Sequence, residues 1–197
     1  MVRVAYVVLV LAVAVQRMLE VRVSRMNEAE LLARGGTEHA PEQMRVMVAI
    51  HTAWLVCALA EVLLLDRPFH RGLGFAALAV FTIGQVLRIL AMSALKTRWT
   101  VKVITVPNEP PVHAAIFRYV RHPNYLGVIL EIAALPLVHG GWMTAIVFSL
   151  ANGLLLTRRI RAEEKALCES SDYAAQFSGQ PRFLPKLAAK TTRQRGA

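Results

Sequence analysis

The stretch Arg118-Tyr-Val-Arg-His-Pro-Asn-Tyr-Leu-Gly-Val-Ile-Leu-Glu131 places a cluster of polar side chains directly before an apolar helical segment. A second boundary of this kind lies at residues 152–164, Asn-Gly-Leu-Leu-Leu-Thr-Arg-Arg-Ile-Arg-Ala-Glu-Glu, where an apolar helix runs into charge. Charged groups next to hydrocarbon cost free energy unless they have a partner or a function. The two boundaries together predict a site for a polar cofactor that opens onto a membrane.

The composition of the 197-residue chain is that of a membrane protein, because 55% of the residues are hydrophobic and only 18% are charged. The net charge of +10 has no accompanying aromatic and basic motif for nucleic acid. Basic residues on a membrane protein mark its cytoplasmic face and its contact with anionic lipid. We therefore expect membrane lipids, and no nucleic acid, as partners. Cys57 and Cys168 share no informative spacing, so we expect neither a disulfide nor a metal site.

Hydropathy predicts an all-α, integral membrane helical bundle of about five transmembrane helices. The hydrophobic segments are residues 2–19, 45–65, 72–95, 124–138 and 142–160. The fourth is short, and Pro136 with the Val138-His-Gly-Gly-Trp142 turn predicts that the last two form a helical hairpin. Between the first two spans, residues 21–44 fit a surface helix that ends before Gly35-Gly36. The residues after Lys186 lack apolar periodicity and are predicted to form a mobile tail.

Basic residues are distributed unequally between the two faces of this bundle. The loops at residues 17–45 and 96–121 and the C-terminal region from residue 158 carry 19 of the 23 Lys and Arg residues, and the opposite face carries 3. The positive-inside rule then places the N-terminus outside and the C-terminus in the cytoplasm. Arg3 and Ala12-Val13-Ala14 also fit a signal peptide, but the charge asymmetry favours a first segment that spans the membrane. The excess of 18 Arg over 5 Lys hints at a bacterial source, and so at a bacterial inner membrane.

Three polar residues lie at a similar depth on three predicted spans. Arg88 and Glu131 are each seven residues from the cytoplasmic end of their helices, which places both about 10 Å deep. Asn152 lies at a similar level on the last helix. They form either a functional polar cluster or an ion pair that only holds helices together. Glu61 and His51 are interpreted as snorkelling or packing residues.

A polar stripe follows the last predicted helix. At 100° per residue, Asn152, Arg159 and Glu163 share one face that begins in the membrane and ends in the cytoplasm. The simpler interpretation is a surface pair between Arg159 and Glu163, four residues apart. Arg158 and Arg161 are more plausibly contacts to lipid headgroups.

The start of the fourth segment leaves two alternatives open for each of two residues. His122 precedes Pro123 at a helix start, where free N–H groups favour an anionic ligand, so His122 is either a cap or a ligand. Tyr125 is either an interfacial aromatic residue or a ring that faces a cofactor.

This ordered set of residues resembles the isoprenylcysteine carboxyl methyltransferase family. The resemblance covers residues 80–186 and includes Gln85, Leu87-Arg88, Arg98-Trp99-Thr100, the two boundaries quoted above, Tyr173 and Pro181-Arg-Phe-Leu-Pro185. It implies one membrane methyltransferase domain over residues 1–197, with N-terminal spans and a loop in 1–75, a catalytic core in 76–186 and the tail in 187–197. The family usually has Gly-Pro-Tyr where this chain has Ala115-Ile116-Phe117.

The resemblance also implies S-adenosylmethionine as cofactor, held near a cytoplasmic C-terminal segment. By position, the cofactor-binding residues would be His122, Pro123, Asn124, Tyr125, Leu126, Gly127, Glu164, Arg182, Phe183, Leu184 and Pro185. Arg159 and Glu163 would be catalytic and face the acceptor.

The length is similar to short bacterial members, some of which are associated with type III polyketide synthases. The expected acceptor is therefore a lipophilic molecule, either a prenylated cysteine carboxylate or an alkylpyrone or alkylresorcinol hydroxyl. Two alternatives stay open: an NADPH-dependent sterol reductase with a similar Arg-His-Pro-Asn-Tyr element, and a non-enzymatic lipid-binding protein. The sequence does not indicate an oligomeric state.

The charge asymmetry makes a topological prediction: residues 96–121 and the C-terminus lie in the cytoplasm. A reporter that is active only in the cytoplasm should be active when fused to the C-terminus, and a periplasmic reporter at the same place should be silent. The opposite pattern would contradict the orientation.

Overall fold

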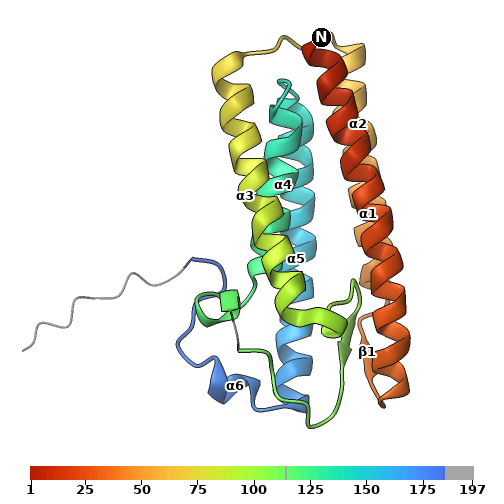
Figure 1. Cartoon of the computed structure of the whole chain (residues 1–197), viewed down its shortest axis with the longest axis vertical. Helices are drawn as coiled ribbons and strands as arrows, with labels where there is room; N and C mark the ends of the chain where they lie inside the picture. The colour runs from red at the N-terminus through yellow and green to blue at the C-terminus, as the bar shows by residue number, and fades with distance from the viewer. Residues whose placement is uncertain (114, 185–197) are drawn as a thin grey trace, which may run out of the picture.

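The computed structural model describes residues 1–113 and 115–184. Its elements, in order, are α1 Val2–Ala33, β1 Thr37–His39, α2 Glu42–Leu64, α3 Arg71–Leu95, η1 Lys96–Arg98, β2 Val103–Thr105, η2 Ala115–Arg118, α4 Pro123–Leu137, α5 Trp142–Ser170 and α6 Tyr173–Gln176. The long helices run side by side, with α1 and α2 along one flank and α3, α4 and α5 forming the rest of the bundle (Figure 1). Pro185 and the predicted tail lie outside the described residues.

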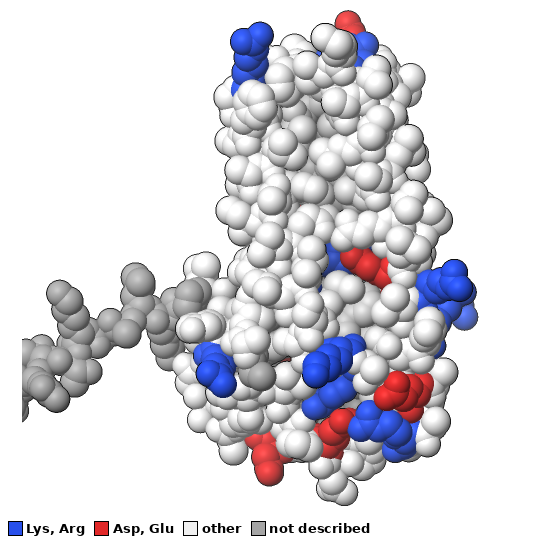
Figure 2. Space-filling view, viewed as in Figure 1, with Lys and Arg blue, Asp and Glu red and all other residues white. Residues whose placement is uncertain are grey.

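Four of these helices are long and apolar enough to cross a membrane, and α4 is a shorter apolar helix. On the face shown in Figure 2, charged side chains gather toward the end of the molecule that carries α6. The middle of the helical bundle is almost free of them on this face. The predicted helical hairpin is present, since α4 and α5 pack against each other across the turn at Gly140-Gly141. Gly140 adopts a φ of 75°, which a residue with a side chain rarely does. The all-α membrane bundle is thus confirmed.

The first helix is longer than the sequence pattern predicts. A span over residues 2–19 and a separate surface helix were expected, but α1 continues without a break to Ala33. No Gly or Pro interrupts residues 2–33, so nothing in the chain ends the helix before Gly35. Its second half buries Glu20, Ser24, Glu28 and Leu31. Glu20 contacts Arg88 on α3, while Ser24 and Glu28 contact the segment that follows α3.

Strands β1 and β2 form a small antiparallel sheet that the sequence did not predict, pairing Thr37 with Thr105 and His39 with Val103. Strands of three residues are too short to show an alternating pattern, which explains why they were missed.

Pro136 lies within α4, where it removes one hydrogen bond from the helix. The carbonyl left without a helical N–H is that of Ile132, four residues earlier. The indole Nε1 of Trp54 on α2 donates to this oxygen at 3.1 Å. Trp54 is fully buried, in a core shared by Tyr6, Val10, Phe81 and Leu135. The proline is therefore tolerated because a neighbouring helix replaces the missing donor.

The sequence interpretation took Glu61 to be a snorkelling or packing residue. In the structure its carboxylate instead caps the start of α5. The carboxylate is buried and accepts hydrogen bonds from the backbone N–H groups of Met143 at 3.1 Å and Thr144 at 2.7 Å. Arg67 Nε also donates to it at 3.0 Å. An acidic group suits a helix N-terminus because the first N–H groups have no helical partner.

Arg88 and Glu131 form an ion pair at 3.0 Å, and two further charges from α1 join them. Glu20 accepts from Arg88 at 2.6 Å and from Arg17 at 2.6 Å, and Arg17 also pairs with Glu131. We call these four residues the buried charge cluster. Counting Arg17 as a loop charge was wrong, since its side chain is only 16% exposed.

Asn152 is also buried, but among the described residues its side-chain oxygen has no hydrogen-bond partner.

The cluster makes a prediction about stability. Arg88→Met or Glu131→Leu alone leaves a charge without its partner and should lower the free energy of unfolding by about 3 to 5 kcal/mol, as for other buried pairs. The double variant removes one charge of each sign and should lose less than the sum of the two. Arg71→Met, an exposed position on α3, is the matched control. Unfolding in detergent measures the four variants, and strictly additive losses would show that the two residues do not interact.

Candidate functional site

Two hollows meet near the end of the bundle that carries α6. The first, the polar cavity, lies between the 95–112 segment, the start of α4, the second half of α5 and α6. The second, the apolar cleft, has a volume of about 1080 Å³ and lies between α1, α2, α4 and α5. Five residues line both: Trp99, Thr100, Asn124, Tyr125 and Arg159. Ligands in the polar cavity and in the apolar cleft would therefore both contact these five residues.

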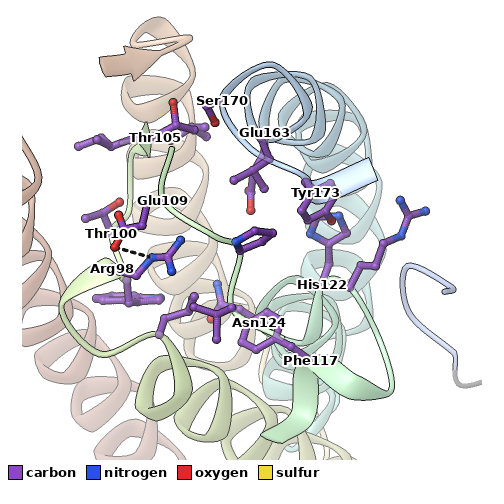
Figure 3. Close-up of a pocket in the computed structure, with 18 of the residues that line it drawn as sticks. Arg98, Thr100, Thr105, Glu109, Phe117, His122, Asn124, Glu163, Ser170 and Tyr173 are labelled. Atoms are coloured by element: carbon purple, nitrogen blue, oxygen red, sulfur yellow. Dashed lines mark ion pairs between the residues drawn. The ribbon is translucent and has the colours of Figure 1, made fainter. Parts of the chain in front are cut away.

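His122 lies at the N-terminus of α4, and its ring does not cap the helix. Instead Nε2 lies 3.0 Å from Glu164 Oε1, and the ring centroid is 5.5 Å from that of Tyr125. The side chain is buried and lines the polar cavity together with Glu163, Phe117 and Tyr173 (Figure 3). His122 is therefore not a helix cap, and its ring forms part of the cavity wall, where it could contact a ligand.

Tyr125 is buried between the two hollows and is not an interfacial aromatic residue. Its hydroxyl donates to Glu163 and accepts from Arg159 Nε at 2.9 Å. Arg159 and Glu163 thus do not form the surface pair of the simpler interpretation. They are joined through the Tyr125 hydroxyl instead.

The guanidinium of Arg159 is held at two points. Nε donates to Tyr125, and Nη2 donates to the carbonyl oxygen of Val101. Among the described residues Nη1 makes no hydrogen bond, and it is not among the enclosed polar atoms. Because Arg159 lines both hollows, Nη1 and the second N–H of Nη2 remain as donors for a ligand there.

Glu164 connects the chain segments around His122. Its carboxylate pairs with Arg121 at 3.2 Å, with His122 at 3.0 Å and with Arg182 at 2.6 Å. The backbone N–H groups of Arg121 and His122 donate to the carbonyls of Pro181 and Arg182, both at 3.0 Å. Glu164 therefore holds the C-terminal segment against the start of α4 and does not itself line the polar cavity.

The other predicted cofactor residues divide by position. Pro123 and Asn124 line the polar cavity, and Phe183 packs against the cluster formed by Tyr125, Leu156 and Ile160. Leu126 and Gly127 do not line it, and Leu184 is exposed. Gly127 faces α3, where a Cβ atom would lie 2.5 Å from Arg88 Cγ, so it serves the close packing of α3 on α4. Pro185 lies outside the described residues.

The predicted site residues did not include the wall of the polar cavity that lies opposite His122 and Glu163. Arg98, Thr100 and Glu109 face Glu163 and His122 across the cavity, with Arg98 Nε 3.7 Å from Glu109 (Figure 3). Arg98-Trp99-Thr100 belonged to the sequence resemblance, which was the signal that could have found this wall.

The stretch in which the chain departs from the family's usual Gly-Pro-Tyr also reaches the cavity. It forms η2, in which Ala115 has a φ of 49° and Phe117 is buried in the cavity wall. A φ of this sign is easier for glycine than for alanine, so the turn is kept at some cost in strain.

Three enclosed polar atoms of the cavity wall have no partner among the described residues: Arg121 Nε, Asn124 Oδ1 and the Tyr173 hydroxyl. Burial raises the pKa of Tyr173, and the carboxylates of Glu163 and Glu164 raise it further, so its hydroxyl stays protonated. An acceptor and two donors are therefore available to a polar ligand.

Comparison with known proteins places this site within the matched part of the chain. A sequence profile of the isoprenylcysteine carboxyl methyltransferase (ICMT) family matches residues 77–169. The chain is 35% identical over 164 residues to the uncharacterized protein YpbQ of Bacillus subtilis, a match that covers 83% of this chain and 96% of YpbQ. An uncharacterized protein of Haemophilus influenzae is 30% identical over 154 residues, which cover 77% of this chain and 88% of that protein. The profile match includes the 95–112 segment, α4 and nearly all of α5.

Proposed function

Because the chain belongs to the isoprenylcysteine carboxyl methyltransferase family, we propose that it transfers a methyl group from S-adenosylmethionine to an oxygen of a lipophilic acceptor. The observation that carries the proposal is the junction of a polar and an apolar hollow at Tyr125 and Arg159. Methyl transfer between a water-soluble cofactor and a lipid-soluble acceptor needs two sites of opposite character that meet at one point.

The residues of the polar cavity fit S-adenosylmethionine by their chemistry. Glu109 and Glu163 offer carboxylates to its ammonium group, and Arg98 and Arg121 offer cations to its carboxylate. The aromatic rings of Phe117, Tyr173 and Phe177 provide apolar surface for its adenine. Asn124 Oδ1 and the Tyr173 hydroxyl supply an unpartnered acceptor and donor. We propose that His122, Pro123, Asn124 and Tyr125 form the cofactor site with these residues.

Glu164, Arg182 and Phe183 contribute to this site indirectly. They hold the C-terminal segment beside His122, which closes that side of the cavity. The carry-over of cofactor roles to Leu126 and Gly127 is not part of the proposal, because neither lines the cavity.

When bound, the cofactor supplies a methyl group activated by its positive sulfur. The protein has to place an acceptor oxygen in line with that group and keep water away. Arg159 Nη1 is available to orient a carboxylate, which is already ionised at neutral pH. For a phenol-like hydroxyl, Glu163 is the nearest base, and its bond from Tyr125 holds it at the junction.

The apolar cleft fits the hydrocarbon part of the acceptor. Its walls include Val10, Leu11, Leu55, Val56 and Leu59, on the faces of α1 and α2 that look toward α4 and α5. A prenyl or alkyl chain in this cleft would leave its polar end beside Arg159. We therefore propose a prenylated carboxylate or an alkylpyrone or alkylresorcinol hydroxyl as the acceptor, in a multi-pass protein of a bacterial inner membrane with its C-terminus in the cytoplasm.

The cofactor assignment predicts selective stabilisation. S-adenosylhomocysteine, the demethylated product, should raise the unfolding temperature of the detergent-purified protein, since a ligand that binds only the folded state stabilises it. NADPH at the same concentration should leave that temperature unchanged. Stabilisation by NADPH alone would favour the reductase alternative and overturn the proposal.

The division of roles predicts two different defects. Arg159→Ala should reduce methyl transfer at least about 100-fold and leave the affinity for S-adenosylhomocysteine within about tenfold, because Arg159 acts on the acceptor. Glu163→Gln should behave similarly for a hydroxyl acceptor. His122→Ala should weaken S-adenosylhomocysteine binding first, because it loosens the Glu164 contacts that hold the cavity wall.

Calorimetric titration and a methylation assay with a lipid-tailed phenol and a prenylated cysteine separate the two defects. Arg158→Ala, the exposed neighbour of Arg159 on α5, is the matched control and should resemble the parent protein. An Arg159→Ala variant with normal turnover would remove Arg159 from the proposed catalytic residues.

A further inference from the structure

The segment Trp99–Val101 separates the polar cavity from the apolar cleft. Trp99 and Thr100 line both hollows, and Val101 lines the cleft. Thr100 lies across the polar cavity from Glu163 (Figure 3). The position of this segment therefore sets the shape of the junction at which the acceptor and the cofactor would meet.

Helix α1 holds this segment by its backbone. The Val101 N–H donates to Ser24 Oγ at 2.8 Å, and Asn27 Nδ2 donates to the Trp99 carbonyl at 2.7 Å. The Ser24 hydroxyl itself donates to Glu28 at 2.6 Å, which fixes its rotamer so that an oxygen lone pair is directed at Val101. Ser24 is only 1% exposed, so water does not compete for this bond.

Both backbone groups of Val101 are bound to other elements. Its N–H donates to Ser24 on α1, while its carbonyl accepts from Arg159 Nη2 on α5. Arg159 has one further anchor, the Tyr125 hydroxyl. If the Val101 peptide moved, one of the two bonds that orient the guanidinium would be lost, and its remaining donors would shift with it.

We infer that Ser24 is a positioning residue for methyl transfer: through the Val101 peptide it sets the orientation of Arg159. The inference rests on the proposed function, in which Arg159 orients the acceptor oxygen. Ser24 lies outside residues 77–169, so the family match gives it no role. Small errors in the placement of a reacting group lower the rate of the chemical step far more than they lower substrate binding.

Ser24→Ala tests the inference because it removes the bond to Val101 and leaves the helix intact. We expect kcat to fall about tenfold, as the loss of one buried hydrogen bond allows. The KM for S-adenosylmethionine and the affinity for S-adenosylhomocysteine should stay within about twofold of the parent. Ser24→Thr, which keeps the hydroxyl, should restore kcat.

Hydrogen exchange of the peptide that covers residues 99–105 gives a readout that does not depend on activity. Ser24→Ala should speed exchange in this peptide, because the Val101 N–H loses its acceptor. Thr82→Ala is the matched control: it removes a hydroxyl that bonds only within α3, and should change neither kcat nor this exchange. Should Ser24→Ala not fold, Ser24→Cys keeps the volume and offers only a weak acceptor.

Unchanged exchange would overturn the inference, as would a normal kcat in Ser24→Ala while the parent protein turns over. A raised KM for the cofactor with unchanged kcat would also overturn it, because the segment would then only shape the polar cavity. Failure of the proposed function looks different. The parent protein would then neither bind S-adenosylhomocysteine nor transfer methyl groups, and the catalytic role of Ser24 would fall with it, while the exchange result would still decide whether Ser24 holds Val101.

Discussion

The arrangement of the helices depends on the four charges buried between α1, α3 and α4. Arg17 and Arg88 each pair with both Glu20 and Glu131, so every member has two partners of opposite sign. An unpaired charge in hydrocarbon is costly, so these ion pairs hold α1 against α3 and α4 at this level. Nearer the other end of the bundle, Tyr6, Val10 and Val13 of α1 pack into the hydrophobic core. Since α1 forms one wall of the apolar cleft, the same contacts keep that cleft in shape.

Helix α1 also acts at a second level, nearer the polar cavity. There Ser24 and Asn27 bind the backbone that separates the two hollows. The part of the chain matched by the family profile supplies Arg159, Tyr125 and most of the polar cavity, and α1 supplies the surface against which they are aligned. The site is thus built from two regions far apart in the sequence, and the N-terminal helix is more than a membrane anchor.

Much of the fold could be predicted because hydropathy and turn residues act locally. The spans and the hairpin at Gly140-Gly141 follow from composition. Helical depth placed Arg88 and Glu131 at one level, where an ion pair was one of the two interpretations. The roles of Arg17, Glu61 and the 99–105 segment did not follow, because each depends on a partner 50 or more residues away. In the sequence alone Arg17 resembles a loop charge, because its partner Glu131 lies on a distant helix. Strand β2 is too short to show an alternating pattern. The family resemblance named several residues of the polar cavity wall, and it also named Leu126 and Gly127, which do not line that cavity.

The bond from Trp54 to the Ile132 carbonyl places an evolutionary constraint on two distant positions. While Pro136 is present, that carbonyl has no donor within its own helix. A side chain at position 54 that cannot reach this oxygen with an N–H group leaves it unpaired in hydrocarbon. If Pro136 is replaced first, α4 regains its own donor, and residue 54 then has to fill the core but no longer has to supply an N–H. The order of the two changes therefore matters: descent can lose the proline and then the tryptophan, whereas the reverse order passes through an intermediate with an unpaired carbonyl. Among related chains, a proline at this position should consequently be accompanied by a donor on the neighbouring helix.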